Sequence, residues 1–333
     1  MHIIKIKVVI RIWRCIMFIS YNLEAFGEKL KELRRDLGYS QRELEKQSGI
    51  SSDTLRRIEK GEVIPRYETL ELLSSLYKED LLELLKESRS HKMLTEYYDA
   101  LDDIITTYND EKMRALEKEI RDSFKENKDL VFINPNEVIQ LLLLIRGAAL
   151  YHSRFESDKT DAKNILLDAL RLTQPSFNIT QFMTYKYSFI ELRILLLYAI
   201  LLAEEKELSL STKILYFILE RLKKGAPTPY QMFLLVKIYT NICYNYHLED
   251  AHKKVLLVAD EALAFCLEKE TTHGLNSLYY RKGIAEYHLK NKNYMSSLFR
   301  SFFILKLTGK EDLLAIYQKV TKEQYGIEIP MEY

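Results

Sequence analysis

The chain has 333 residues, of which 47% are apolar and 29% are charged, as in globular proteins with room for two domains. Its net charge is +1, which excludes a general basic field that attracts nucleic acid, so any DNA contact must come from locally placed charges. The three cysteines are widely spaced and form no Cys-x-x-Cys pair, which argues against structural zinc and favours a reducing, cytoplasmic setting.

Residues 1–22 form an extension ahead of the first predicted helix. The segment is apolar and β-branched, and cations divide it into runs too short for a signal peptide or a membrane span. It could be a strand-like arm, a basic tail that reaches DNA, a frayed terminus, or residues ahead of the functional start. We favour the last reading, with Met17 as the start, because the module that follows needs nothing before about Ser20.

Residues 23–38 predict an amphipathic helix. Its apolar residues Phe26, Leu30, Leu33 and Leu37 recur at spacings of four, three and four, and Gly38 ends it. Two more short helices are expected at residues 67–76 and 78–87.

Between them, Ser40 to Gly61 reads as two short helices joined by a tight turn. Ser40 with Glu43 forms a capping box at the start of the first helix. Gly49 stands where a left-handed residue is needed, and Ser51 caps the second helix. A short helix, a glycine turn and a second helix with one polar face are the layout of a helix-turn-helix motif, whose second helix enters the major groove of DNA.

A pattern spread over about sixty positions strengthens this reading. It consists of Leu33-Arg34, Gly38-Tyr39-Ser40-Gln41, Leu44, Gly49-Ile50-Ser51, Ile58-Glu59-Lys60-Gly61, Pro65 and Leu70. With these residues, positions 24–87 resemble the five-helix Cro/C1-type (XRE-type) domain. The resemblance implies that Arg34 pairs with Glu59 and that Gln41 touches the DNA backbone. Glu45 departs from the family, which prefers alanine there, and this leaves the packing angle of the two motif helices open.

The resemblance also implies that Ser52, Asp53, Arg56 and Arg57 of the second motif helix face the bases. Arg56 and Arg57 could contact guanine, and Asp53 could accept a hydrogen bond from cytosine. The alternative is that these are only solvated helix positions, and the net charge of +1 over Ser40–Gly61 is a weak electrostatic signal. The predicted DNA-binding residues are Gln41, Arg42, Ser51, Ser52, Asp53, Thr54, Arg56 and Arg57.

Residues 91–333 show a helical pattern with hardly any strand-like alternation, so the whole chain is expected to be all-α. We place a DNA-binding domain at 23–90 and a helical repeat domain at 91–333. The aromatic and small positions of the tetratricopeptide (TPR) pattern recur three times. These matches are Leu144/Gly147/Ala148/Tyr151, Tyr239/Ile242/Cys243/Tyr246 and Tyr280/Gly283/Ile284/Tyr287, followed by Ala162, Ala169, Ala259 and Ala262. The pattern predicts an α-solenoid of degenerate TPR-like helical hairpins, and the alternative is a helical bundle without repeats.

An XRE-type domain followed by TPR-like repeats resembles the peptide-pheromone regulators of Gram-positive bacteria and their phages. This group is often called RRNPP and includes the Rgg, NprR, PlcR and PrgX types. The resemblance implies a cytoplasmic, homodimeric transcription regulator that binds a palindromic double-stranded operator. It also implies that a short signalling peptide binds the repeats and controls DNA binding.

Asparagine side chains suit a peptide site because one amide both donates to and accepts from a peptide backbone. The candidate peptide-binding residues are Asn241, Asn245, Arg146, Asn276 and Tyr280. For Asn241 and Asn245 the alternative is a bridge between helices, and for Arg146 it is pairing with an acid.

Catalysis finds little support, because the chain has no Gly-rich phosphate loop, no HExxH and no G-x-S-x-G motif. We expect no enzyme, no cofactor, no metal site and no membrane association. His247 and His252, five apart, would lie on different faces of a helix, which argues against a metal pair. Competing functions are a constitutive XRE-type repressor whose repeats serve only dimerisation or protein contacts, and an adaptor that binds a protein partner.

Overall fold

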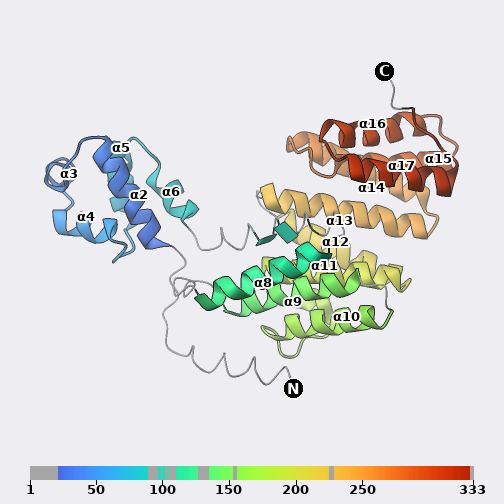
Figure 1. The fold of residues 1–333 in the computed structure, drawn as a ribbon, viewed down its shortest axis with the longest axis horizontal. Coiled ribbons are helices and arrows are strands. Elements are labelled where there is room, and N and C mark those ends of the chain that lie inside the picture. Colours follow the sequence, from blue (N-terminus) through green and yellow to red (C-terminus); the bar gives the residue numbers. More distant parts are fainter. Residues whose placement is uncertain are drawn as a thin grey trace. The chain divides into compact units, whose positions relative to one another are not determined.

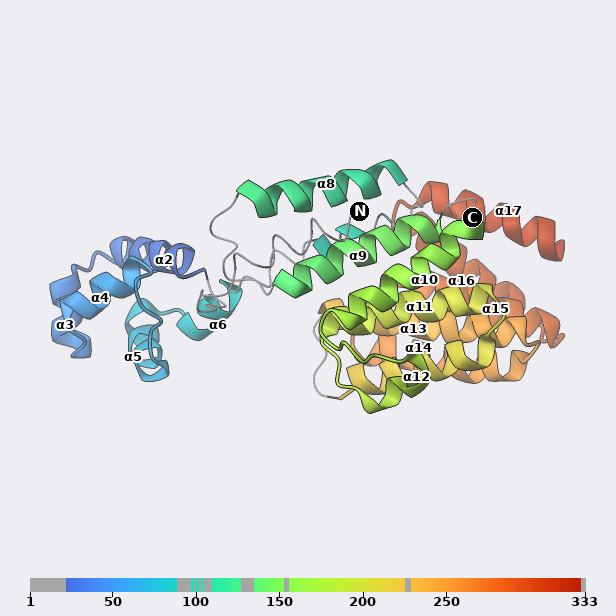
Figure 2. The same cartoon turned by 90° about the horizontal axis from the view of Figure 1, so that it is seen from below.

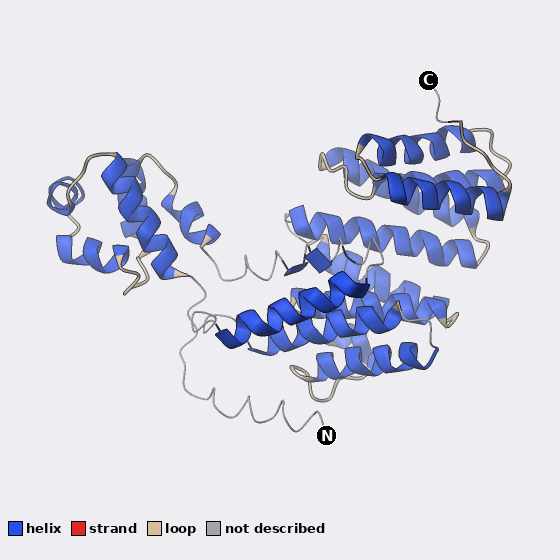
Figure 3. Cartoon of the chain, viewed as in Figure 1, coloured by secondary structure: helices blue, strands red, loops and turns tan. Residues whose placement is uncertain are grey.

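The computed structural model describes residues 22–88, 97–98, 100–101, 104, 110–126, 135–152, 156–224 and 229–330. These residues form helices and connecting turns, and none of them lies in a strand (Figure 3). The all-α prediction is therefore confirmed. The chain divides into two compact units, residues 1–102 with 114–138 and residues 103–113 with 139–333. Residues 1–21 and the predicted boundary at residue 90 lie outside the described residues, so the domain limits stay predictions.

The first unit contains five short helices around one core, and the boundary between the units falls within a later helix, α8 (Asp110–Glu126). The five are α2 (Leu23–Asp36), α3 (Gln41–Ser48), α4 (Ser52–Glu59), α5 (Tyr67–Tyr77) and α6 (Leu81–Glu87). Their core consists of Leu23, Phe26, Leu30, Leu44, Leu55, Ile58, Leu70, Leu73, Tyr77, Leu81 and Leu85. Every one of the five helices contributes to it, so the five-helix arrangement follows from burying one apolar stripe per helix.

The predicted helix starts are confirmed in the motif. The Ser40 side chain accepts from the Glu43 backbone at 3.2 Å, and the Glu43 carboxylate accepts from the Ser40 backbone at 2.7 Å. Gly49 has a φ of 73°, which is the left-handed conformation that ends α3. The Ser51 side chain accepts from the Thr54 backbone and so caps α4. These local bonds fix where each helix begins and therefore which side chains α4 exposes.

The second unit is a stack of consecutive helices, seen from green to red in Figures 1 and 2. Its helices are α9 (Pro135–Tyr151), α10 (Glu156–Arg171), α11 (Phe189–Glu204), α12 (Leu208–Leu222), α13 (Pro229–Leu248), α14 (His252–Glu268), α15 (Leu275–His288), α16 (Tyr294–Leu307) and α17 (Glu311–Tyr325), with a 3₁₀ helix, η2 (Ile179–Thr184), before α11. From α10 on, each helix contacts the next, and α13 also contacts both α11 and α15. The predicted stack of helical hairpins is confirmed.

Small residues permit the close helix contacts that the repeat pattern predicted. A Cβ atom on Gly283 would lie 2.7 Å from Cγ of Leu298 on the next helix, and one on Gly147 would lie 2.9 Å from Cδ2 of Leu166. Ala259 of α14 is also completely buried. A larger side chain at these positions would force the paired helices apart.

The most apolar helix, α11, is a core helix. Nearly all of its residues are buried, and Ser188 and Glu191 form a capping box at its start. Among the residues that the structure describes, no helix is both long and apolar enough to cross a membrane. The apolar composition of α11 is therefore explained by its place inside the stack.

Candidate nucleic-acid interface

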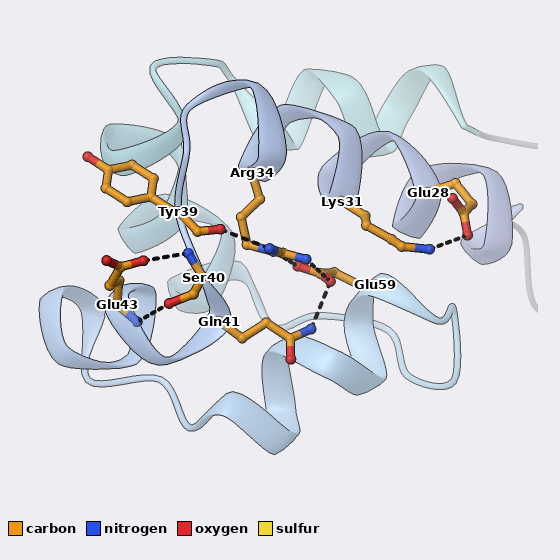
Figure 4. A network of polar contacts seen from close by, with 8 residues as sticks. All are labelled: Glu28, Lys31, Arg34, Tyr39, Ser40, Gln41, Glu43 and Glu59. Atoms are coloured by element: carbon orange, nitrogen blue, oxygen red, sulfur yellow. Dashed lines mark hydrogen bonds and ion pairs between the residues drawn. The ribbon is translucent and has the colours of Figure 1, made fainter.

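A buried ion pair holds the polar face of α4 in place (Figure 4). Arg34 of α2 donates from Nε and Nη2 to the two carboxylate oxygens of Glu59, at 2.6 and 3.0 Å. Its third contact, from Nη1, is to the carbonyl oxygen of Tyr39 at 2.8 Å. The Arg34 and Glu59 side chains are only 12% and 5% exposed. The pairing expected from the family resemblance is thus confirmed, and it ties the end of α4 to α2 and to the start of the motif.

Gln41 joins the same network. Its side-chain amide donates to Glu59 at 2.8 Å, and the side chain is half-buried at the start of α3. Gln41 was predicted to touch the DNA backbone, and that contact remains a prediction. The bond to Glu59 shows how the fold orients the amide at the edge of α3 next to α4.

Glu45, the departure from the family pattern, makes a polar bridge between the two motif helices. Its exposed carboxylate accepts a hydrogen bond from the hydroxyl of Ser52, the first residue of α4. A hydrogen bond across the two helices replaces the apolar contact that an alanine would make. Ser52 is consequently half-buried and engaged within the motif.

The outward side of α4 carries charges that are paired with one another. Arg56 donates to Asp53 at 2.8 Å, and this hydrogen bond holds the pKa of the Asp53 carboxyl below its usual value. Arg56 also lies 3.5 Å from Glu62, in the loop that follows the helix. Arg57 is exposed, with its Nε 3.9 Å from Glu62. These exposed pairs are weak enough to be exchanged for contacts with another anion.

The other predicted DNA-binding residues lie at the same two helix starts. Arg42 is exposed on the first turn of α3. Ser51 and Thr54 are exposed at the start of α4, and their hydroxyls lie 2.9 Å apart. Ser51 therefore acts as a cap, and Thr54 has a local hydrogen-bond partner. All eight predicted residues come from α3, α4 and the cap of α4, so the fold gathers them in one region.

The sequence of this region matches a family model described as helix-turn-helix, over residues 30–84. Residues 30–84 form a helix-turn-helix domain. The search of curated proteins found no match to the sequence.

Solved structures share the fold over most of the chain. PlcR of Bacillus thuringiensis, in complex with the peptide PapR7 and DNA, matches with a TM-score of 0.62 and 17% identity, covering 87% of this chain and 99% of PlcR. ComR from S. thermophilus, in complex with DNA and its signalling peptide ComS, matches with a TM-score of 0.55 and 17% identity over 91% of this chain and 100% of ComR. The SHP pheromone receptor Rgg2 of Streptococcus dysgalactiae matches with a TM-score of 0.55 and 12% identity, covering 90% of this chain and 99% of Rgg2. The resemblance predicted from the sequence is thus confirmed as a shared fold.

The predicted peptide-binding residues lie on three helices of the second unit, Arg146 on α9, Asn241 and Asn245 on α13, and Asn276 and Tyr280 on α15. Asn245 is only 1% exposed, and its amide donates to the hydroxyls of Ser211 and Thr212 at 2.8 and 3.0 Å. It bridges α12 and α13, which is the alternative raised for it. Tyr280 is 8% exposed and its hydroxyl accepts from Thr321 of α17 at 3.1 Å, so it too packs between helices.

The remaining three candidates are more accessible. Arg146 is exposed on α9 and has no polar partner among the described residues. Asn276 is half-buried at the start of α15, where its amide makes a long contact of 3.4 Å to Ser277. Asn241 is half-buried and donates to the Lys237 carbonyl at 2.8 Å, while its own carbonyl oxygen has no partner among the described residues.

Around Asn241 the structure assembles a strip that we call the α13 strip, made of Phe233, Lys237, Asn241 and Tyr244 on α13 and Arg281 on α15. All five side chains are half-buried. The Lys237 ammonium lies 4.6 Å from the Phe233 ring centre, and the Arg281 guanidinium lies 4.8 Å from that of Tyr244. Of these residues only Asn241 was predicted from the sequence. The four on α13 are separated by four, four and three residues, a spacing that could have indicated one shared helix face.

The histidines judged to be on different helix faces are in fact in contact. Nδ1 of His247 lies 3.2 Å from Nδ1 of His252, because α13 ends at Leu248 and the chain reverses before α14. The ring of His252 also stacks on His288, with centres 4.2 Å apart. The geometric argument made from the sequence was therefore wrong. Even so, among the described residues no three His, Cys, Asp or Glu side chains are arranged to hold a metal ion.

The contacts of His247 assign its tautomer. Nε2 lies 3.0 Å from the Arg281 carbonyl, which can only accept, so Nε2 carries the proton. Nδ1 must then accept from Nδ1–H of His252. Burial lowers the pKa of His247 to about 3, and burial likewise lowers the pKa of His252, with the neighbouring His288 adding to the effect. Protonating His247 would set two N–H groups against each other next to the Arg281 side chain.

We therefore expect the second unit to lose stability as the pH falls below about 6.5, the ordinary pKa of an unfolded histidine. Because the folded pKa is lowered, the unfolded state binds more protons and stability rises with pH. His247 alone predicts a loss of about 1 kcal/mol between about pH 7 and 5.5. Thermal unfolding across this range checks the expectation.

His247→Gln is the informative variant for this test. A glutamine amide can still donate to the Arg281 carbonyl while its oxygen accepts from His252, but it does not titrate. Its pH profile should be flatter than that of the wild type over the same range. Identical slopes for the two proteins would show that His247 does not govern the acid sensitivity.

Proposed function

We propose that the protein is a sequence-specific, DNA-binding transcription regulator whose DNA binding is controlled by a short signalling peptide. The observation that carries the proposal is the hydrogen-bond network of Arg34, Glu59 and Gln41. This network holds α4 in a helix-turn-helix domain so that its polar face is exposed. A helix presented in this way suits insertion into the major groove. The fold shared with PlcR and ComR, each solved with DNA and a peptide, supports the second half of the proposal.

The bases would be read by the exposed side of α4. Arg56 and Arg57 suit guanine, and Asp53 suits the amino group of cytosine. Arg42 and Gln41 at the start of α3, with the hydroxyls of Ser51 and Thr54, would contact phosphates, and Ser52 would face the bases once its hydroxyl is released from Glu45. A net charge near zero makes these positioned contacts more important than bulk attraction. We further propose that a homodimer binds a palindromic operator, since one eight-residue recognition helix contacts few bases.

The peptide would bind along the α13 strip. The side-chain oxygen of Asn241 can accept a hydrogen bond from a peptide N–H. Its second amide proton, the one not donated to Lys237, can be donated to a peptide carbonyl. Arg281 has no carboxylate partner among the described residues and lies over Tyr244, so it can meet a peptide carboxylate. Arg146 and Asn276 remain secondary candidates because of their exposure. We leave out Asn245 and Tyr280, whose polar atoms are engaged between helices.

Two measurements test the proposal. Selection of bound duplexes from a random pool should return one enriched, inverted-repeat sequence. A library of short synthetic peptides, screened by thermal shift, should contain members that stabilise the protein and change its affinity for that sequence. No enrichment over the starting pool would contradict regulation through DNA.

The alternative function is a constitutive repressor that uses its stack of hairpins only for dimerisation or protein contacts. Both functions predict an enriched duplex in the selection experiment, but only the proposed one predicts that a peptide changes DNA affinity. A selected operator whose binding no peptide alters would favour this alternative.

Arg281→Ala is expected to weaken peptide binding at least tenfold, because a charge-assisted bond to a carboxylate is lost. Asn241→Ala should weaken it by a smaller factor, because a neutral hydrogen bond contributes less. Isothermal calorimetry with a peptide found by the thermal-shift screen measures both. Arg300→Ala is the matched control, since Arg300 of α16 also lies over a tyrosine ring, that of Tyr279. If Arg281→Ala and Arg300→Ala changed the peptide affinity equally, the proposal that the peptide binds along the α13 strip would be wrong.

A further inference from the structure

One carboxylate lies among three cations at the end of the recognition helix. Glu62 is 3.5 Å from Nη1 of Arg56, 3.9 Å from Nε of Arg57 and 4.0 Å from Nζ of Lys60. All four side chains are between 41% and 59% exposed. Two of these cations are the residues expected to meet DNA, so the negative charge stands where a phosphate would otherwise be attracted.

The backbone of Glu62 is held in this position. Its N–H donates to the Arg57 carbonyl at 2.9 Å. The preceding residue, Gly61, has a φ of +69°, and a Cβ atom there would lie 2.7 Å from the backbone of Leu23 and Glu24 at the start of α2. Only glycine fits this left-handed turn, so the chain leaves α4 along one path. The backbone of Glu62 therefore keeps its side chain within reach of the three cations.

The ion pairs of Glu62 contribute little to stability, because exposed pairs of this length are weak. Their effect falls on an approaching anion. Sequence-independent DNA binding depends almost entirely on contacts between cations and phosphates. A phosphate that approaches Arg56, Arg57 or Lys60 must displace Glu62 or be repelled by it. A guanine contact of Arg56 or Arg57 must also replace a pair with Glu62, but it provides two directed hydrogen bonds that a phosphate contact on an arbitrary sequence does not add to.

We propose that Glu62 lowers the affinity of this protein for DNA of arbitrary sequence by competing with phosphates for Arg56, Arg57 and Lys60, and so raises the dependence of binding on base contacts. This inference rests on the proposed function as a DNA-binding regulator. The chain thereby gains specificity by weakening the wrong complexes rather than by adding contacts to the right one.

The test uses the full chain and a random-sequence duplex of about 30 base pairs, with salt varied from about 50 to 200 mM. Glu62→Gln should bind about three- to tenfold tighter than wild type in fluorescence anisotropy. Its slope of log affinity against log salt should be steeper by about 0.9, the value for one additional phosphate contact. Glu62→Asp keeps the charge and should remain close to wild type.

Glu83→Gln is the matched control, because Glu83 of α6 has an exposed lysine partner, Lys86, at 3.0 Å and the charge change is the same. It should leave both affinity and slope unchanged. The inference is overturned if Glu62→Gln matches wild type, or if Glu83→Gln gives the same gain, which would mean that only net charge matters. Absence of binding by wild type and Glu62→Gln alike, to this duplex and to any selected one, would overturn the proposed function together with the inference.

Discussion

Arg34→Ala is expected to destabilise the helix-turn-helix domain by about 3–5 kcal/mol. The substitution leaves the 5% exposed carboxylate of Glu59 with Gln41 as its remaining side-chain donor. An unpaired buried charge costs far more than the net contribution of the pair, which is the reason for the large effect. Urea unfolding of the full chain, with hydrogen exchange read at the amides of α2 to α4, measures the loss where it occurs.

Two further variants make this result specific. Lys31→Ala removes a partly exposed cation from the same helix, 3.1 Å from Glu28, and should cost less than about 1 kcal/mol. The double variant Arg34→Met with Glu59→Met removes both buried charges and should recover most of the stability, since apolar replacements of buried pairs are often neutral. If Arg34→Ala lowered the free energy of unfolding no more than Lys31→Ala, the Arg34–Glu59 pair would not be what holds α4 against α2.

The helix-turn-helix domain could be predicted from sequence because its signals are local. The Ser40–Glu43 box and Gly49 fix helix ends through bonds that span three or four residues. The Arg34–Glu59 pair spans 25 residues, and only the family resemblance supplied it. The surroundings of Glu62 could not be predicted in this way, because the sequence does not show that Arg56, Arg57 and Lys60 converge on its carboxylate.

The peptide-binding candidates could not be placed from spacing alone. Asn241 and Asn245 are four residues apart and share one face of α13, yet the first is half-buried and the second fully buried. The difference arises because Ser211 and Thr212 of α12 lie against one end of that face. Spacing defines the face of a helix but not the neighbour that covers each part of it.

The same limit explains the histidines. His247 lies near the end of α13 and His252 at the start of α14, so their spacing on a single helix could not show that their rings meet. Asp250 adopts a φ of 55° in that turn, which brings His252 back beside His247. The α13 strip, too, depends on the contact between α13 and α15, which brings Arg281 over Tyr244.

Replacing both Arg56 and Arg57 by alanine is expected to lower affinity for the selected operator at least about thirtyfold. Each bidentate contact of an arginine with guanine contributes about 1–3 kcal/mol, and about 2 kcal/mol for the pair is the lower limit. The slope of log affinity against log salt should also become shallower, because two cations are lost. Anisotropy with the operator and with a random duplex separates the two effects.

The charge-matched control is the double variant Lys31→Ala with Lys86→Ala, on α2 and α6. It should leave discrimination between operator and random duplex unchanged. Arg56→Ala alone should cost more than Arg57→Ala, because it also releases the Asp53 carboxylate that Arg56 holds at 2.8 Å and leaves it facing DNA. Adding Asp53→Asn to Arg56→Ala should then recover the difference. If it did not, the pairing between Asp53 and Arg56 would play no part in how the recognition helix meets DNA.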